Sequence, residues 1–170
     1  MVDFNKNIWA PWRMEYIEEM CEPKGVCFLC RVRDNPAEDE KNLVLIRGKN
    51  CMVMLNRFPY TNGHTLISPY DHECDLDKIS DETLLEMMQQ LRIMKRRLEI
   101  TSKAEGFNVG INLCPCAGAG LPDHLHLHIV PRWSGDTNFM AVLGEVRIIP
   151  EALEKTYRKL KESLANQDAH

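Results

Sequence analysis

The chain has 170 residues, which is the length of one globular domain and too short to bury two substantial cores. Its 21 lysines and arginines against 25 acidic residues give a formal net charge of −4, which argues against a general basic surface for nucleic acid. No apolar run approaches the roughly 20 residues of a membrane span, and the amino-terminal MVDFNKNIWAPWRMEYIEEM lacks the apolar centre of a signal peptide. We therefore expect one domain over residues 1–170, in the cytoplasm, with no nucleic-acid or membrane partner.

The first predicted elements are three strands. An acidic stretch at residues 33–42, RDNPAEDEKN, is predicted to be a surface loop. The apolar runs LVLIR (43–47) and CMVML (51–55) flank a Gly-Lys-Asn turn and predict a hairpin. HTLIS (64–68) predicts a third strand after the turn-rich FPYTNG.

A long amphipathic helix is predicted next. Ser80 is a suitable N-cap, and Asp81 and Glu82 favour the positive end of the helix dipole. We expect Gly106 to mark the end of the helix. Apolar residues at helical spacing define its buried face: Leu84, Leu85, Met87, Met88, Leu91, Met94 and Leu98.

Two strands and a final helix complete the pattern. FNVGINL (107–113) and HLHLHIV (124–130) predict strands joined by the loop CPCAGAGLPD, and Pro150 is expected to open the last helix. That helix has one apolar face, formed by Leu153, Tyr157, Leu160 and Leu164. The order of strands, helix, strands and helix predicts an α+β domain with a largely antiparallel sheet.

Three histidines at alternate positions are the most informative feature. In a strand, His124, His126 and His128 face one way and the intervening apolar residues face the core. A single histidine is more often a half-buried polar residue, but three at fixed alternation indicate a shared site. Neutral imidazole is a nucleophile and a proton donor or acceptor, which suits nucleotidyl transfer through a histidine intermediate.

This stretch resembles the signature of the histidine triad family, in which three histidines alternate with apolar residues. The resemblance covers nearly the whole chain, including LNRFPYTNGHTLISP, GFNVGINL and VPRWSGDTNF. The stretches IWAPWRMEYI and GDTNF are similar to the bacterial branch related to diadenosine tetraphosphate phosphorylases. The resemblance implies a fold with one long central helix and a carboxy-terminal helix, an amino-terminal packing extension over 1–26 and a triad region over 107–133.

The resemblance also implies roles for individual residues. His126 would attack the α-phosphate of a nucleotide, and water or phosphate would resolve the nucleotidyl-histidine. His128 and His64 match the imidazoles that hydrogen-bond the phosphate oxygens. Asn56 matches a ribose contact and Asn112 a residue beside the phosphates, although both also fit ordinary turn or strand-end positions.

The glycine-rich loop leaves the acceptor undecided. Gly118, Ala119 and Gly120 would let backbone N–H groups approach the phosphates. Hydrolase-type relatives usually have Gln, and phosphorylase-type relatives Ser, at the position of Gly120, so the choice between water and phosphate stays open. Trp133 favours the phosphorylase-like branch as a substrate-binding residue, and it fits core or dimer packing equally well.

Seven cysteines are many for a reducing compartment and shift the interpretation toward metal or redox chemistry. A C-x₂-C pair is half of a zinc site, yet alone it equally fits two buried thiols or a redox pair. Zinc-containing relatives, including galactose-1-phosphate uridylyltransferase, use four positions that match Cys27, Cys30, His72 and His124. Four protein ligands leave no open position, so this zinc would be structural. Cys114 and Cys116 fit small residues that fill a tight loop.

The expected function is cleavage of an adenosine polyphosphate of the diadenosine tetraphosphate type. The alternatives are an adenosine phosphoramidate or adenylyl-sulfate hydrolase, and a nucleotide-binding regulatory protein without turnover. The family pattern implies a homodimer through the long helix and a sheet edge, with Trp9 and Trp12 as candidates to cover the partner's site. The base preference and the physiological substrate stay open.

Overall fold

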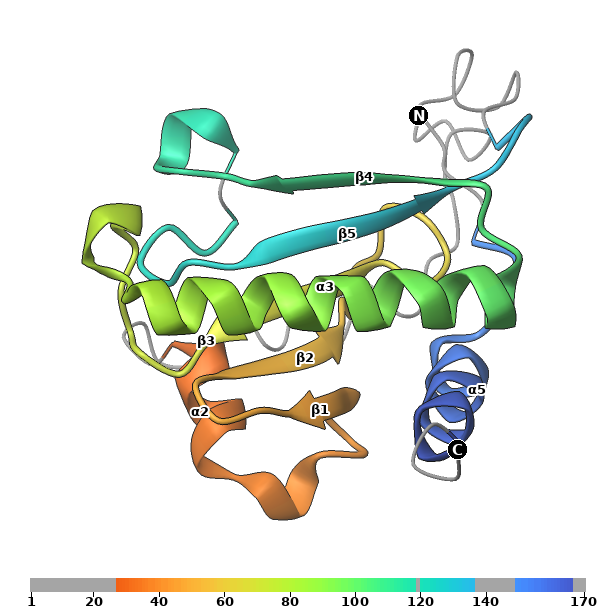
Figure 1. Ribbon diagram of the computed structural model, residues 1–170, viewed down its shortest axis with the longest axis horizontal. Coiled ribbons are helices and arrows are strands. Elements are labelled where there is room, and N and C mark those ends of the chain that lie inside the picture. The colour runs from red at the N-terminus through yellow and green to blue at the C-terminus, as the bar shows by residue number, and fades with distance from the viewer. Residues whose placement is uncertain (1–26, 119, 137–148, 167–170) are drawn as a thin grey trace, which may run out of the picture.

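The computed structural model describes residues 27–118, 120–136 and 149–166, so the predicted extension over 1–26 lies outside the described residues. One antiparallel sheet organises the chain (Figure 1), in the order β1-β2-β3-β5-β4. Its strands are β1 (Val44–Arg47), β2 (Cys51–Leu55), β3 (Thr65–Pro69), β4 (Gly106–Ile111) and β5 (Leu127–Arg132). The predicted hairpin and third strand are confirmed.

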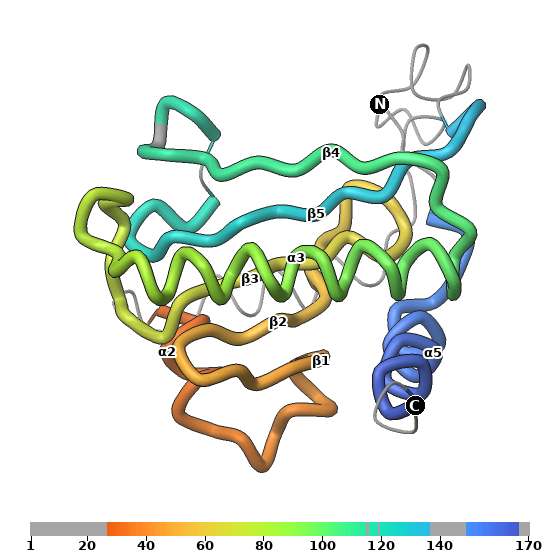
Figure 2. The backbone as a smooth tube through the Cα atoms, viewed as in Figure 1, coloured from red at the N-terminus to blue at the C-terminus, as the bar shows by residue number. Residues whose placement is uncertain are grey.

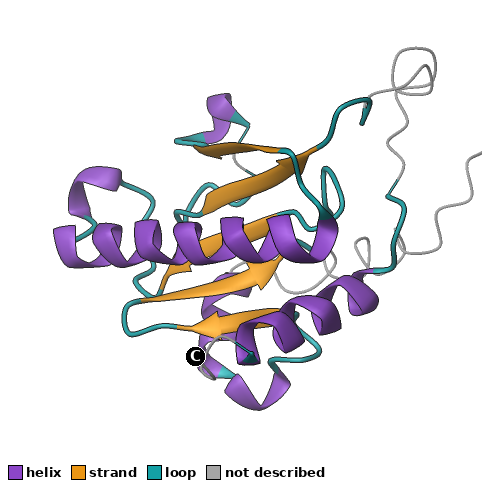
Figure 3. Cartoon of the chain, turned by 45° about the vertical axis from the view of Figure 1, so that its right-hand side comes forward, coloured by secondary structure: helices purple, strands orange, loops and turns teal. Residues whose placement is uncertain are grey.

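Helices cover both faces of this sheet. Figure 3 shows α3 and α5 on one face and α2 on the other, which confirms the α+β fold. The helices are α2 (Phe28–Asp34), α3 (Asp81–Ser102) and α5 (Leu153–Ala165), with single 3₁₀ turns η2 (Pro36–Glu38), η3 (Leu76–Lys78) and η4 (Pro115–Ala117). Within the described ranges, no helix combines the length and the apolarity needed to cross a bilayer.

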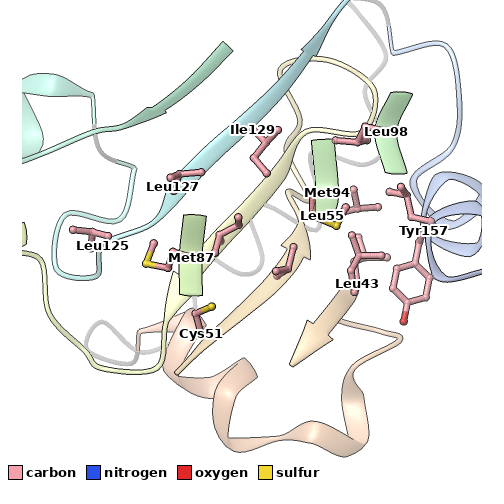
Figure 4. Packing of buried hydrophobic residues seen from close by; sticks show 14 of the residues in the cluster. Leu43, Cys51, Leu55, Met87, Met94, Leu98, Leu125, Leu127, Ile129 and Tyr157 are labelled. Atoms are coloured by element: carbon pink, nitrogen blue, oxygen red, sulfur yellow. The ribbon is translucent and has the colours of Figure 1, made fainter. Parts of the chain in front are cut away.

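The main core lies between the sheet and the pair α3 and α5 (Figure 4). Alternate strand residues point into it, as the period of two requires. Its strand residues include Val53, Leu55, Ile67, Leu127 and Ile129, and its helix residues include Met87, Met94, Leu98, Tyr157 and Leu160.

A second cluster lies on the opposite face, where α2 packs against the strands. Leu29 and Val32 of α2 contact a patch formed by Val44, Met52, Met54 and Leu66. Every residue of β2 is therefore buried. This explains why its sequence, CMVML, is continuously apolar instead of alternating.

The long helix begins as predicted and ends earlier. The Ser80 hydroxyl accepts a hydrogen bond from the backbone N–H of Thr83, at 3.2 Å. The prediction that Gly106 ends the helix is wrong, because Lys103 adopts the left-handed conformation (φ 55°) and caps it, while Gly106 begins β4. Two residues of the predicted buried face, Leu85 and Met88, are exposed.

Two further boundaries differ from the prediction. α5 begins at Leu153 with Ala152 as its N-cap, so Pro150 precedes the helix and does not open it. Part of the predicted loop 33–42 is helical, because α2 continues through Asp34 and Pro36 starts the turn η2. The apolar face of α5 is confirmed, since Tyr157 and Leu160 are buried.

The loop between β2 and β3, residues 56–64, is fixed at several points. Thr61 donates a hydrogen bond to the Pro131 carbonyl of β5 at 2.9 Å, and Asn62 bonds Thr156 of α5 at 3.1 Å. Gly63 has a φ of +76°, and an added Cβ would lie 2.8 Å from Leu98. Both features favour glycine at this position, and the loop is held against the core just before His64.

Candidate active site and metal centre

The three alternate histidines do not share one strand. β5 begins at Leu127, so the predicted strand over 124–130 is wrong at its start and only His128 lies in it. The Leu125 N–H bonds the Glu73 carbonyl at 2.7 Å, which takes this segment out of the ladder. The apolar side is confirmed, because Leu125 and Leu127 are core residues. The structure buries His124 and His126 as well, so these two rings do not lie on an open surface.

His124 has its lone pair aimed at two thiols. Its Nε2 lies 3.0 Å from the Pro69 carbonyl, and a carbonyl only accepts, so the proton is on Nε2. Its Nδ1 lies 3.2 Å from Cys27 Sγ and 3.6 Å from Cys30 Sγ. Burial lowers the pKa of His124, which keeps the ring neutral.

The four predicted metal ligands come together. Cys27 and Cys30 lie at the start of α2, and His72 and His124 lie after β3 and before β5, at the same end of the sheet (Figure 2). Their ligand atoms all lie within 4.8 Å of one another, with Cys30 Sγ 3.2 Å from His72 Nδ1. Tetrahedral zinc separates such atoms by roughly 3.3–3.8 Å, from its bond lengths to sulfur and nitrogen. The cluster can hold a metal ion, and its donor set suits zinc.

His126 presents the opposite ring nitrogen. Its Nδ1 lies 2.9 Å from the carbonyl oxygen of His124, so the neutral form of the ring has its proton on Nδ1 and its lone pair on Nε2. The His126 ring is 4.8 Å from the His128 ring between centroids. The side chain is 8 % exposed. A neutral imidazole with a fixed lone pair is the form that a nucleophile requires.

His64 and His128 form a directed hydrogen-bonded pair. The Tyr60 backbone N–H donates to His64 Nδ1 at 3.1 Å, so neutral His64 is protonated on Nε2. That N–H faces His128 Nδ1 at 3.0 Å, which leaves the proton of His128 on Nε2. Burial, and secondarily the neighbouring His126, lower the pKa of His128 to about 4. His128 Nε2 is buried and has no hydrogen-bond partner among the described residues.

The residue paired with His128 on the neighbouring strand faces open space. Gly110 of β4 pairs with His128, and a Cβ added at Gly110 would meet nothing within 4 Å. Two residues further, the Asn112 amide donates to the Gly118 carbonyl at 3.3 Å and closes the glycine-rich loop. Gly118 has a φ of +82°, which favours glycine there. Gly120 is exposed, and Ala119 lies outside the described residues.

Of two aromatic residues, Trp133 lies away from the histidines and Tyr60, for which no role was predicted, lies beside them. Trp133 follows β5 at the end away from the metal cluster, and its indole N–H donates to the Ser102 carbonyl at 3.0 Å, so the chain does not bring it to the histidines. Sequence reasoning missed Tyr60, whose ring centroid lies 4.5 Å from that of His64 and 6.0 Å from that of His128. Its position four residues before His64 was the available signal.

Asn56 and the two cysteines of the glycine-rich loop are the remaining residues that the sequence singled out. Asn56 is half-buried beside His64, with its amide nitrogen 3.2 Å from His64 Nδ1. Cys114 and Cys116 are exposed, lie in the glycine-rich loop and are not members of the four-residue metal cluster.

Comparison with known proteins gives consistent results. A family model described as "HIT domain" matches residues 37–135. A Mycobacterium tuberculosis protein named AP-4-A phosphorylase is 35% identical over 95% of this chain and 86% of its own length. An uncharacterized HIT-like protein of the same organism is 34% identical over 69% of this chain and 81% of its own. A crystal structure of a zinc-bound histidine triad family protein from Mycobacterium smegmatis superposes with a TM-score of 0.68 at 30% identity, covering 84% of this chain and 96% of that one.

Proposed function

Because this chain belongs to the HIT-domain family, we propose that it cleaves an adenosine polyphosphate of the diadenosine tetraphosphate type at the α-phosphate. The reaction passes through a nucleotidyl-histidine on His126. The supporting observation is a pair of opposite ring nitrogens on neighbouring rings. His126 offers a lone pair on Nε2, and His128 offers an N–H donor on Nε2 that has no partner among the described residues.

The two steps use these nitrogens in turn. The His126 lone pair attacks the α-phosphorus, and the P–O bond to the remaining polyphosphate breaks. The resulting imidazolium keeps its Nδ1–H on the His124 carbonyl, which disperses the new positive charge. The His128 Nε2–H hydrogen-bonds the phosphate oxygens while negative charge moves to the leaving group. Water or orthophosphate then attacks the phosphorus and releases the nucleotide from His126.

We propose that the four-residue cluster holds zinc. Cys27 and Cys30 supply thiolates and His72 and His124 supply neutral imidazoles, so the ion has four protein ligands and a structural role. The Pro69 carbonyl accepts from the other nitrogen of His124 and fixes that ring, as carbonyls do behind metal-bound histidines.

We also propose a homodimer. Leu85 and Met88 on α3 are 61% and 49% exposed, and Val109 on the edge strand β4 is 46% exposed. Among the described residues, no strand pairs with the outer edge of β4. Such an edge with apolar neighbours is suited to pairing with a second copy. Cytoplasmic localisation stays a prediction.

The acceptor is a separate question, and a product assay answers it. A relative named for phosphorolysis favours orthophosphate, while Gly120 has no side chain with which to select it. Diadenosine tetraphosphate incubated with the protein should yield ADP and ATP only when phosphate is present. AMP and ATP without phosphate would identify a hydrolase instead.

The central step is tested by replacing His126. His126→Gly should abolish turnover and keep AMP binding, because the phosphate-side imidazoles and the glycine-rich loop are unchanged. A stable nucleotidyl adduct should be trapped on His126 of the wild-type protein and not on the variant. A variant that still turns over the substrate would contradict the proposed role.

A further inference from the structure

We propose that Asn56 is a positioning residue that fixes the direction of the proton in the His64–His128 pair. The inference rests on the proposed function, because it concerns the N–H donor that this pair presents to the phosphates. It assigns to Asn56 a role that the predicted ribose contact does not include.

The orientation of the Asn56 amide is set by a backbone group. The Phe58 N–H lies 2.9 Å from Asn56 Oδ1, and a backbone N–H only donates, so the oxygen is the atom that faces it. The amide nitrogen must therefore be the atom 3.2 Å from His64 Nδ1. An amide NH₂ has no lone pair to offer, so His64 Nδ1 has to accept.

Two donors thus converge on one nitrogen of a fully buried ring. Asn56 Nδ2 and the Tyr60 backbone N–H both point at Nδ1 of His64, which is 0 % exposed. A proton on Nδ1 would bring three N–H groups together without water to separate them. The proton of neutral His64 is therefore held on Nε2, facing His128.

The position of the proton on His64 determines which group His128 presents to the phosphates. If His64 carried its proton on Nδ1, its Nε2 would become an acceptor and His128 would have to donate from Nδ1. His128 Nε2 would then present a lone pair to the phosphate oxygens instead of an N–H. Repulsion would replace a hydrogen bond at the position where charge develops. Asn56 acts on this outcome through His64 without touching the phosphorus.

Kinetics can separate this role from a ribose contact. Asn56→Ala should lower kcat by about five- to tenfold, the usual worth of one buried hydrogen bond. The loss should be equal with diadenosine tetraphosphate and with its 2′,3′-dideoxy counterpart, because the histidine pair does not depend on the ribose. If the variant affects only the substrate that has ribose hydroxyls, and acts on KM, the positioning role is overturned.

A matched control comes from the same loop. The Thr61 hydroxyl also makes one hydrogen bond, which it donates to the Pro131 carbonyl and not to His64. Thr61→Val should keep kcat within about twofold of wild type, in line with the modest worth of a neutral hydrogen bond outside the histidine pair. An equal loss in both variants would mean that Asn56 only stiffens the loop, which contradicts the proposal.

A spectroscopic test does not require turnover. Long-range ¹H–¹⁵N correlation at neutral pH should show His64 protonated on Nε2 alone in the wild-type protein. Asn56→Asp replaces the donor with an acceptor and should protonate Nδ1, while its carboxylate can still accept from ribose hydroxyls. Nδ1 already protonated in wild type, or left unprotonated in Asn56→Asp, overturns the inference. If the wild-type protein has no turnover, the proposed function fails and this measurement still decides the role of Asn56.

Discussion

Titration of His128 should be visible in the stability of the protein. Burial holds its pKa at about 4, against 6.5 for an ordinary histidine, and the gap corresponds to about 3 kcal/mol. Above pH 6.5 the folded and unfolded states are both neutral at this residue. As pH falls from 6.5 toward 4, only the unfolded state takes up the proton, so stability decreases. Relative to neutral pH, about 2 kcal/mol of the free energy of unfolding should be lost at about pH 5.

The hydrogen bond to His64 explains why His128 resists a second proton, and it also suggests a control variant that cannot titrate. A second proton on His128 would sit on Nδ1, which already accepts from His64 Nε2–H. His128→Gln keeps an acceptor for that N–H and cannot titrate. Urea unfolding of both proteins, saturated with zinc, should show the wild type losing about 2 kcal/mol more than the variant between about pH 7.5 and about pH 5. Equal losses would refute the reasoning, as would a pKa near 6.5 measured for His128 by NMR.

Two further predictions concern the metal and the oligomer. Cys30→Ser should lose zinc and several kcal/mol of stability, because a structural metal contributes to folding directly. Cys116→Ser, which lies outside the cluster, should retain about one zinc per chain. Metal analysis and thermal melting measure both variants, and zinc retained in Cys30→Ser argues against the cluster. Light scattering should give twice the chain mass of 19.7 kDa for the wild type. Leu85→Glu, on the exposed face of α3, should shift the protein toward the monomer. A monomeric wild type contradicts the dimer.

The sequence predicted the parts of the fold that local physics determines. The hairpin, the third strand and the N-cap at Ser80 depend on apolar runs and on one capping hydroxyl, and all three are present. The end of α3 was wrong because Lys103, a residue that rarely takes a positive φ, caps the helix three residues before the expected glycine. The short helix α2 was missed because it buries only two residues, Leu29 and Val32, and two apolar positions do not define a helical periodicity.

The candidate site shows a similar division. The four metal ligands could be named from the sequence by their match to a family pattern, and the structure brings all four together. The contacts of Asn56 could not be predicted from the sequence, because they depend on which end of its amide faces the Phe58 N–H. The place of Tyr60 against two histidines depends on the path of the loop 56–64, which long-range contacts to β5 and α5 determine.

The alternation of the histidines has a different meaning in the structure from the one that a strand suggests. His124 turns its ring toward the cysteines and offers its carbonyl oxygen to the Nδ1–H of His126. A spacing of two residues is what lets a backbone carbonyl reach the ring of the second next side chain. The histidine that belongs to the four-residue cluster is therefore also the residue whose carbonyl sets the tautomer of the proposed nucleophile. His128 meets a separate set of constraints through His64. The two ring nitrogens of the proposed reaction, Nε2 of His126 and Nε2 of His128, therefore have their proton positions set by different neighbours.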